Sequence, residues 1–147
     1  MSETAAEKPM FRSAFRKRRC LIPASGFYEW KAVAAKKKRP YAIRLADDKP
    51  FAFAGLFEKW AGPDGDVESC CILTTAPNEL AGAIHNRMPA ILDPRDFDLW
   101  LDPEEQDAAS VAPLLRAFPA TKMRAYPVST WVNDVKHKDA RCVEPAA

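Results

Sequence analysis

Glu29 is the carboxylate whose surroundings most suggest chemistry, because it stands among three aromatic residues in the stretch Leu21–Lys31, LIPASGFYEWK. A Pro, Ser and Gly break in this stretch separates two predicted strands. Neighbouring strand residues alternate between faces, so Glu29 shares a face with Phe27 and opposes Tyr28 and Trp30. A carboxylate that faces inward against a ring is desolvated, which suits it to proton transfer. The alternative is an exposed face on which Glu29 is solvated beside an interface aromatic.

A second polar group contains Thr74, His85, Asn86 and Arg87. Imidazole titrates near neutral pH and can pass a proton in either direction. Arginine can hold a phosphate through two parallel hydrogen bonds. The alternative for His85 is a single histidine hydrogen-bonded within a loop. The sequence does not show whether Glu29 and His85 meet in space.

A third polar stretch, Ser129–Lys138, ends in basic residues. Asn133, Lys136 and Lys138 could contact a phosphate backbone. The stretch is equally compatible with a solvated C-terminal loop, which is the preferred interpretation from the sequence.

The charge of the chain is asymmetric, although its formal net charge is only +2. The first 40 residues contain eleven Lys and Arg residues and three Glu residues. Such a basic region suggests a patch for a polyanion, but a solvated hairpin tip is the preferred interpretation of Lys36–Arg39. A basic site lined by aromatics suits single-stranded nucleic acid, through base stacking and phosphate pairing, and suits a small anionic metabolite almost as well.

Composition places the chain among globular proteins, since 48% of its 147 residues are hydrophobic and 29% are charged. No apolar run approaches the roughly 20 residues of a membrane span, and the first residues do not resemble a signal peptide. We therefore expect a cytoplasmic or nucleoid-associated protein with no membrane partner. The four cysteines form no CxxC pair and are expected to be reduced and buried, and the sequence predicts neither a metal site nor a cofactor.

Periodicity predicts an α+β fold in which helices lie beside a mixed or barrel-like sheet. Predicted helices are Met10–Lys17 after Pro9, Glu79–Ile84 capped by Asn78, one that starts at Asp93, and one within Ala108–Phe118. Predicted strands are Cys20–Ile22, Gly26–Ala32, Pro40–Leu45, Phe51–Trp60 with a bulge near Gly55, Val67–Thr75, one ending at Leu92, Met123–Val128 and Arg141–Glu144. A loop is predicted over Val33–Arg39.

Three segments resemble the SRAP family, the SOS response-associated peptidases or abasic-site processing proteins. These segments are CLIPASGFYEWK, LTTAPNELAGAIHNRMPAIL and PVSTWVNDVKHKDARCVEP. They follow the family's order, and the resemblance covers essentially the whole chain.

The resemblance implies a protein of the SOS response to DNA damage that binds single-stranded DNA at abasic sites. In this family an autoproteolytically exposed N-terminal cysteine forms a thiazolidine crosslink with the ring-opened sugar, so autopeptidase and lyase-type chemistry are implied. Carried over by position, the catalytic residues are Glu29, which would move protons during amine condensation, and His85, which would assist proton transfer at the sugar and crosslink reversal. Trp30, Thr74 and Arg87 match positions near the family's DNA cleft.

The chain departs from the family pattern at its start, which reads Met1-Ser2-Glu3-Thr4. Family members begin Met-Cys-Gly-Arg and reach an Asn-Ala-Arg motif several tens of residues later, and only Glu3-Thr4 match the end of that segment. Ser2 follows Met1 as the family's cysteine follows its start methionine, and an alcohol is a much poorer nucleophile than the thiol of that cysteine. We therefore expect residues 1–147 to be the C-terminal portion of one SRAP domain, through a late start assignment, a gene remnant or a partial sequence.

The expected function is abasic-site processing on single-stranded DNA, by a monomer. These 147 residues are not expected to form the crosslink themselves, because none of the four cysteines has a free α-amine. The alternatives are a non-catalytic single-stranded DNA-binding remnant and a non-functional gene fragment.

Overall fold

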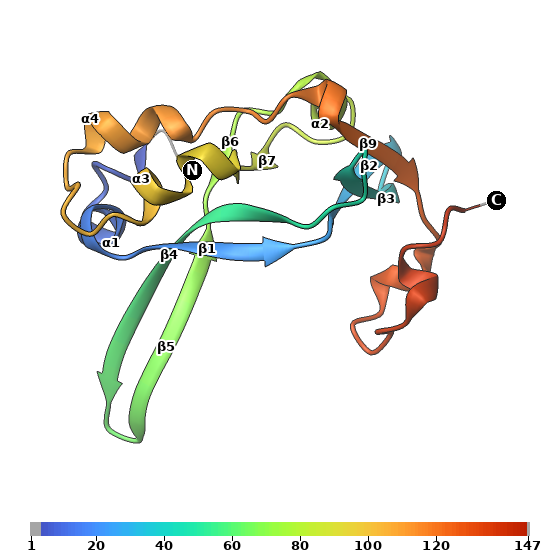
Figure 1. Ribbon diagram of the computed structural model, residues 1–147. Coiled ribbons are helices and arrows are strands. Elements are labelled where there is room, and N and C mark those ends of the chain that lie inside the picture. Colours follow the sequence, from blue (N-terminus) through green and yellow to red (C-terminus); the bar gives the residue numbers. More distant parts are fainter. Residues whose placement is uncertain (1–3, 147) are drawn as a thin grey trace. The chain divides into compact units, whose positions relative to one another are not determined.

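The computed structural model describes residues 4–146 and divides into two compact units (Figure 1). Unit 1 comprises Met1–Pro23, Ala52–Ala76 and Pro89–Phe118, and unit 2 comprises Ala24–Phe51, Pro77–Met88 and Pro119–Ala147. The predicted family match at Glu3 and the expectation that Ser2 is a poor nucleophile concern residues outside the described ones. The assignment of the chain to a single domain stays a prediction.

Unit 1 contains most of the helices and the longest hairpin of the described chain. Its sheet has the order β1–β4–β5, with β8 paired to β4, and the β4–β5 and β4–β8 pairs are antiparallel. Its elements, some of which extend by a residue into unit 2, are α1 (Pro9–Lys17), β1 (Arg19–Ala24), β4 (Phe51–Gly62), β5 (Gly65–Ile72), β6 (Thr74–Thr75), β7 (Met88–Pro89), β8 (Ile91–Leu92), η2 (Pro94–Asp96), α3 (Phe97–Leu101), α4 (Ala108–Val111) and η3 (Ala112–Leu114).

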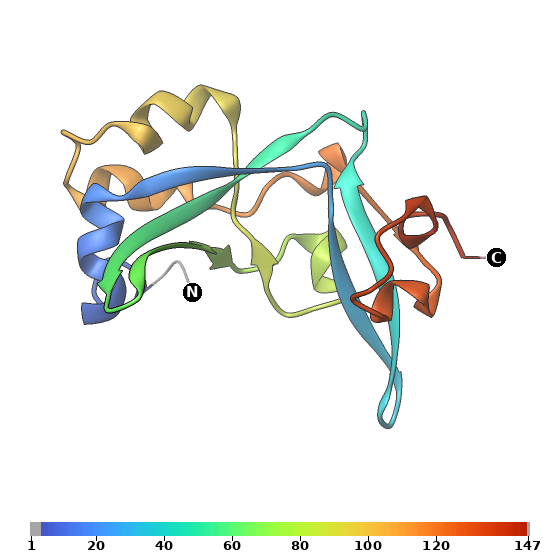
Figure 2. The ribbon, with the colours of Figure 1, turned by 90° about the horizontal axis from the view of Figure 1, so that it is seen from below.

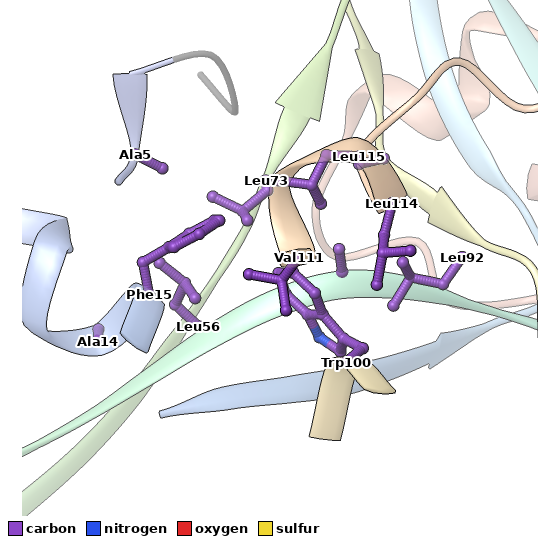
Figure 3. Packing of buried hydrophobic residues seen from close by; sticks show 12 residues of the cluster. Ala5, Ala14, Phe15, Leu56, Leu73, Leu92, Trp100, Val111, Leu114 and Leu115 are labelled. Carbon is purple, nitrogen blue, oxygen red and sulfur yellow. The ribbon is translucent and has the colours of Figure 1, made fainter. Parts of the chain in front are cut away.

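The core of unit 1 is built around Trp100, whose side chain is fully buried. Its ring meets Phe15 edge-on, with the ring centroids 6.0 Å apart. The indole N–H donates a 3.0 Å hydrogen bond to the carbonyl of Cys20, so burial leaves no polar atom of this side chain unsatisfied. Figure 3 shows these rings among the aliphatic side chains of the cluster, which include Leu56, Val111 and Leu114.

Arg19 is a buried cation whose hydrogen bonds all go to main-chain carbonyl groups. Its guanidinium donates to the main-chain oxygens of Phe15 and Arg16 at the end of α1. It also donates to those of Trp100, Asp102 and Glu105, at and beyond the end of α3. Burial lowers the pKa of Arg19, against the opposing effect of Glu105 and Asp102. Five hydrogen bonds compensate for the lost hydration and tie two chain segments together.

Gly55 provides space for side chains of the neighbouring strand β1. The register between β4 and β5 runs through the pair Gly55↔Ile72 without a shift, so the predicted bulge is not found between these strands. A Cβ at position 55 would lie 2.7 Å from Cδ1 of Ile22 and 2.9 Å from Sγ of Cys20. The glycine therefore permits close packing rather than a change of register.

Unit 2 is a three-stranded antiparallel sheet of order β2–β3–β9 with short helical segments. The predicted loop Val33–Arg39 is largely strand, because β2 and β3 join at a tight turn in which Lys36 has φ of 62°. Figure 2 shows this hairpin as two adjoining strands. The elements are β2 (Phe27–Ala34), β3 (Lys37–Leu45), α2 (Glu79–Gly82), η4 (Ala120–Lys122), β9 (Met123–Pro127), η5 (Thr130–Asn133) and η6 (Ala140–Cys142).

The α+β class is confirmed, and the strands form separate antiparallel sheets with no closed barrel among the described residues. The predicted caps are confirmed at Asn78, whose side chain accepts from the amide of Ala81, and at Asp93, which accepts from Arg95. No helix in residues 4–146 combines the length and apolar character that a membrane crossing requires.

Three further predicted elements differ from the structure. The strand Arg141–Glu144 is wrong, because Asp139 accepts a hydrogen bond from the amide of Arg141 and starts the 3-10 helix η6 instead. The helix within Ala108–Phe118 is short, since α4 gives way to η3 at the segment that contains Pro113. The strand Val67–Thr75 is interrupted at Leu73.

Candidate functional site

The strand β2 has two faces, and its register places different chemistry on each. Glu29 pairs with Tyr41 of β3, and Lys31 pairs with Arg39. Since side chains alternate along a strand, Glu29 and Lys31 share one face, while Tyr28 and Trp30 occupy the other. The alternation predicted from the sequence is confirmed, since β2 is a regular strand through these residues.

Glu29 and His85 lie together in unit 2. The Oε1 atom of Glu29 is 3.8 Å from Nδ1 of His85, and the two side chains are 21% and 43% exposed. This separation suits an ion pair with a protonated imidazole but is longer than a direct hydrogen bond. The carboxylate is thus partly desolvated beside an imidazole that remains accessible.

The short helix α2 places His85 at this position. Asn78 caps the helix, and the amide of His85 donates a 2.8 Å hydrogen bond to the carbonyl of Ala81. Helix α2 packs against β9, the third strand of the sheet. The imidazole therefore extends from a capped turn rather than from an unsupported loop.

The backbone of Arg87 holds the imidazole of His85 in either protonation state. The Nδ1 atom lies 3.2 Å from the amide nitrogen of Arg87 and 3.1 Å from its carbonyl oxygen. An unprotonated Nδ1 accepts from the amide, which leaves Nε2 to carry the proton. A protonated Nδ1 donates to the carbonyl, with Glu29 nearby. The ring can gain or lose a proton without losing its support.

A groove of about 560 Å³ lies beside this pair. Its sheet wall includes Lys31 and Tyr41, which flank Glu29 along and across the strands, and its helix wall includes Ile84, the neighbour of His85. The lining is formed by Lys31, Tyr41, Glu79, Leu80, Ala83, Ile84, Ala120, Thr121 and Ala125.

The opposite face of the sheet is covered by the C-terminal segment. The indole N–H of Trp30 donates a 2.9 Å hydrogen bond to Oδ1 of Asn133, and the hydroxyl of Tyr126 donates to the carbonyl of Val143. Tyr28 lies beside Trp30, with ring centroids 6.4 Å apart, and burial raises the pKa of its phenol. These two hydrogen bonds connect this face of the sheet to the C-terminal segment within unit 2.

The structure brings together three of the five residues predicted for the site: Glu29, His85 and the backbone of the half-buried Arg87. Trp30 lies on the other face of β2, bonded to Asn133. Thr74 is half-buried in β6 of unit 1. Among the described residues no cluster of three or more His, Cys, Asp or Glu side chains suits a metal ion.

Sequence reasoning missed Lys31 and Tyr41 as neighbours of Glu29. Lys31 follows from strand alternation alone, because it lies two residues after Glu29. The pairing of Tyr41 with Glu29 could be predicted only from the register of the hairpin. That register depends on the turn at Lys36, and it cannot be inferred until the ends of both strands are known.

The cysteines are free and spread over both units. Cys142 is buried in η6, Cys20 and Cys71 are half-buried, and Cys70 is exposed, so the expectation of buried thiols holds only in part. Burial raises the pKa of the Cys20 thiol, with smaller contributions from Cys70 and Cys71. A raised pKa makes a thiol a weaker nucleophile at neutral pH.

Comparison with known proteins assigns the family. The profile of the SOS response associated peptidases (SRAP) matches residues 1–135. The chain belongs to the SRAP family. The family expected from the GFYEW, TTAPN and IHNRMP segments is therefore confirmed.

Relatives of this SRAP chain include the abasic site processing protein YoqW of Bacillus subtilis, 44% identical over 144 residues that make up 97% of this chain and 64% of YoqW. The abasic site processing protein HMCES of Gallus gallus is 31% identical over 98% of this chain and 48% of its own length. A crystal structure of a protein from Bacteroides thetaiotaomicron superposes with a TM-score of 0.91 at 34% identity, covering 99% of this chain and 64% of that one. The SRAP chain thus spans less than two thirds of these proteins.

Proposed function

We propose that this protein acts in abasic-site processing by binding single-stranded DNA at an abasic sugar, with Glu29 and His85 as its proton-transferring pair. The observation that carries the proposal is the 3.8 Å approach of the two side chains beside a groove. The names of the relatives indicate which kind of DNA damage is involved, since YoqW and HMCES are abasic site processing proteins.

The chemistry of an abasic sugar calls for such a pair. Opening the cyclic hemiacetal removes a proton from the anomeric hydroxyl and delivers one to the ring oxygen. In the proposed mechanism Glu29 moves the first proton, while His85 donates from Nε2 at the sugar. When an amine such as methoxyamine is supplied, Glu29 also moves the protons of its condensation with the aldehyde. The backbone of Arg87 keeps the imidazole oriented through this cycle.

Arg87, Trp30 and Thr74 remain predicted DNA contacts. The position of Arg87 two residues from His85 supports a phosphate contact next to the reacting sugar. Trp30 would reach DNA only from the other face of β2.

The proposal is tested with the purified chain and a single-stranded oligonucleotide that carries one natural abasic site. Binding is followed by fluorescence anisotropy, against the same oligonucleotide with an intact base. We expect tighter binding of the abasic strand and weaker binding as salt is raised. Equal affinity for the abasic oligonucleotide and the intact one would contradict the proposal that the protein recognises the abasic site.

A denaturing gel separates covalent from non-covalent action. A thiazolidine requires a thiol and a free α-amine on one residue, and each of Cys20, Cys70, Cys71 and Cys142 is preceded by another residue. We therefore expect these 147 residues to bind without forming an adduct. The second candidate, a non-catalytic DNA-binding protein, would give the same result on this gel. The two candidates are distinguished by the reactivity of the sugar aldehyde, which a substitution of Glu29 should leave unchanged in a non-catalytic protein.

A further inference from the structure

The groove beside Glu29 and His85 contains a cation that the proposed chemistry does not use. Lys31 is half-buried on the sheet wall of the groove. It lies two residues from Glu29 on the same face of β2, a step of about 6.6 Å along a strand. Arg39, directly across the hairpin, adds a second positive charge to this face.

Within residues 4–146 neither Lys31 nor Arg39 forms an ion pair, whereas Lys49 and Lys59 are paired with Asp47 and Asp66. A partly buried ammonium loses hydration, and that loss is compensated when an anion binds it. Of the described residues that line the groove, Glu79 is the one acid, and it is exposed in the first turn of α2. The groove therefore favours an anionic occupant near Lys31.

The remaining walls indicate that this anion belongs to a nucleotide. Tyr41 presents a ring directly across the strand from Glu29. Leu80 and Ile84 supply apolar surface from the helix side. A base can stack on an aromatic ring while its phosphate pairs with a lysine, and such sites are tolerant of sequence.

We propose that Lys31 binds the phosphodiester next to the abasic sugar, and that Tyr41 stacks on the base of the neighbouring nucleotide. This inference rests on the proposed function, because it assumes that the sugar lies between Glu29 and His85. It adds a substrate contact that fixes the position of the strand rather than a group that moves protons.

The test combines variants of the protein with neutral phosphates in the DNA. Lys31→Met keeps the apolar stem and removes the charge, Lys31→Arg keeps the charge, and Lys49→Met is a matched loss of one lysine in unit 2. Affinity is measured by anisotropy with an oligonucleotide that contains a stable abasic analogue. Single methylphosphonate linkages are then placed at successive positions around the lesion.

We expect Lys31→Met to weaken binding about three- to tenfold and to lower the salt dependence by about 0.7, the value for one phosphate contact on a single strand. Lys31→Arg and Lys49→Met should bind like the wild type. The loss caused by Lys31→Met should disappear when one particular linkage adjacent to the lesion is already neutral. Tyr41→Leu should weaken binding without changing the salt dependence.

Other outcomes overturn the inference in distinguishable ways. Equal binding by Lys31→Met and the wild type removes Lys31 from the DNA contact while leaving the proposed function intact. A loss that is the same whichever linkage is neutral assigns Lys31 to the general field of the protein rather than to one phosphate. If the wild type does not bind the abasic strand, the proposed function and this inference both fail.

Discussion

The two faces of the β2–β3–β9 sheet differ in what covers them, although they alternate residue by residue along the same strand. On one face Lys31 lines a groove, and Glu29 lies 3.8 Å from an accessible imidazole. On the other, Trp30 and Tyr126 are hydrogen-bonded to the C-terminal segment. Of two adjacent residues in one short motif, Glu29 therefore lies on the face that contains the candidate site, and Trp30 lies on the face that the C-terminal segment covers.

The largest expected effect is on the groove face. In the proposed mechanism, Glu29→Gln or His85→Gln slows capture of the abasic aldehyde by methoxyamine about 100-fold, because each removes one partner of acid–base catalysis. The measurement is oxime formation on the bound oligonucleotide. The free energy of unfolding should change by less than about 0.5 kcal/mol, since neither side chain belongs to a buried network. An unchanged capture rate in both variants would contradict the assigned roles.

The packed face should show the opposite behaviour, a loss of stability. Trp30→Ala removes a half-buried ring and the hydrogen bond to Asn133, and should lower the free energy of unfolding by about 2 kcal/mol. Urea denaturation gives this value, and hydrogen exchange over residues 128–146 reports whether the C-terminal segment loosens first. A variant as stable as the wild type would show that the segment is held by other contacts.

A finer comparison isolates the hydrogen bond from the ring. Trp30→Phe keeps most of the apolar surface but loses the N–H donor, and should cost about 1 kcal/mol. Asn133→Ala removes the acceptor, and the double variant should be less destabilised than the sum of the two. Additive losses would mean that the 2.9 Å contact contributes nothing to stability.

The smallest effect is a response of the C-terminal segment to acid. Hydrogen bonds from the Arg141 side chain lower the pKa of Asp139 to about 2. A carboxyl group with a lowered pKa stabilises the fold above its ordinary value of about 4, and that contribution disappears as pH falls toward 2. Arg141 also lies over the ring of Trp131, at 4.0 Å from its centroid.

We therefore expect a small change in Trp131 fluorescence between about pH 4 and pH 2. The pH profile of Asp139→Asn should lack this change. A wild-type signal that stays flat over this range would show that the ion pair does not hold the segment.

Local signals in the sequence were sufficient for much of the fold. Asn78 and Asp93 are capping residues, and each starts a helical segment at the predicted place. The strict alternation of Tyr28, Glu29 and Trp30 predicted their division between two faces. Arg141–Glu144 was wrong because an Asp side chain two residues before Arg141 can cap a turn, a signal that outweighed its β-forming residues.

The site itself depends on contacts between distant parts of the sequence. The approach of Glu29 to His85 joins residues from different segments of unit 2, and no spacing rule supplies that distance. The resemblance to the SRAP family named both residues, but Lys31 and Tyr41 emerged only from the strand register and the groove.

In unit 1 the side chain of Arg19 links two chain segments through hydrogen bonds whose acceptors do not titrate. Its five acceptors are all peptide oxygens, which neither gain nor lose protons between strong acid and strong base. The link between the end of α1 and the end of α3 should consequently persist at a pH where carboxylate-dependent links have opened. Lysine has three donors on a single nitrogen and could not bind the same five acceptors. Even the conservative substitution Arg19→Lys would therefore break the link between the two segments.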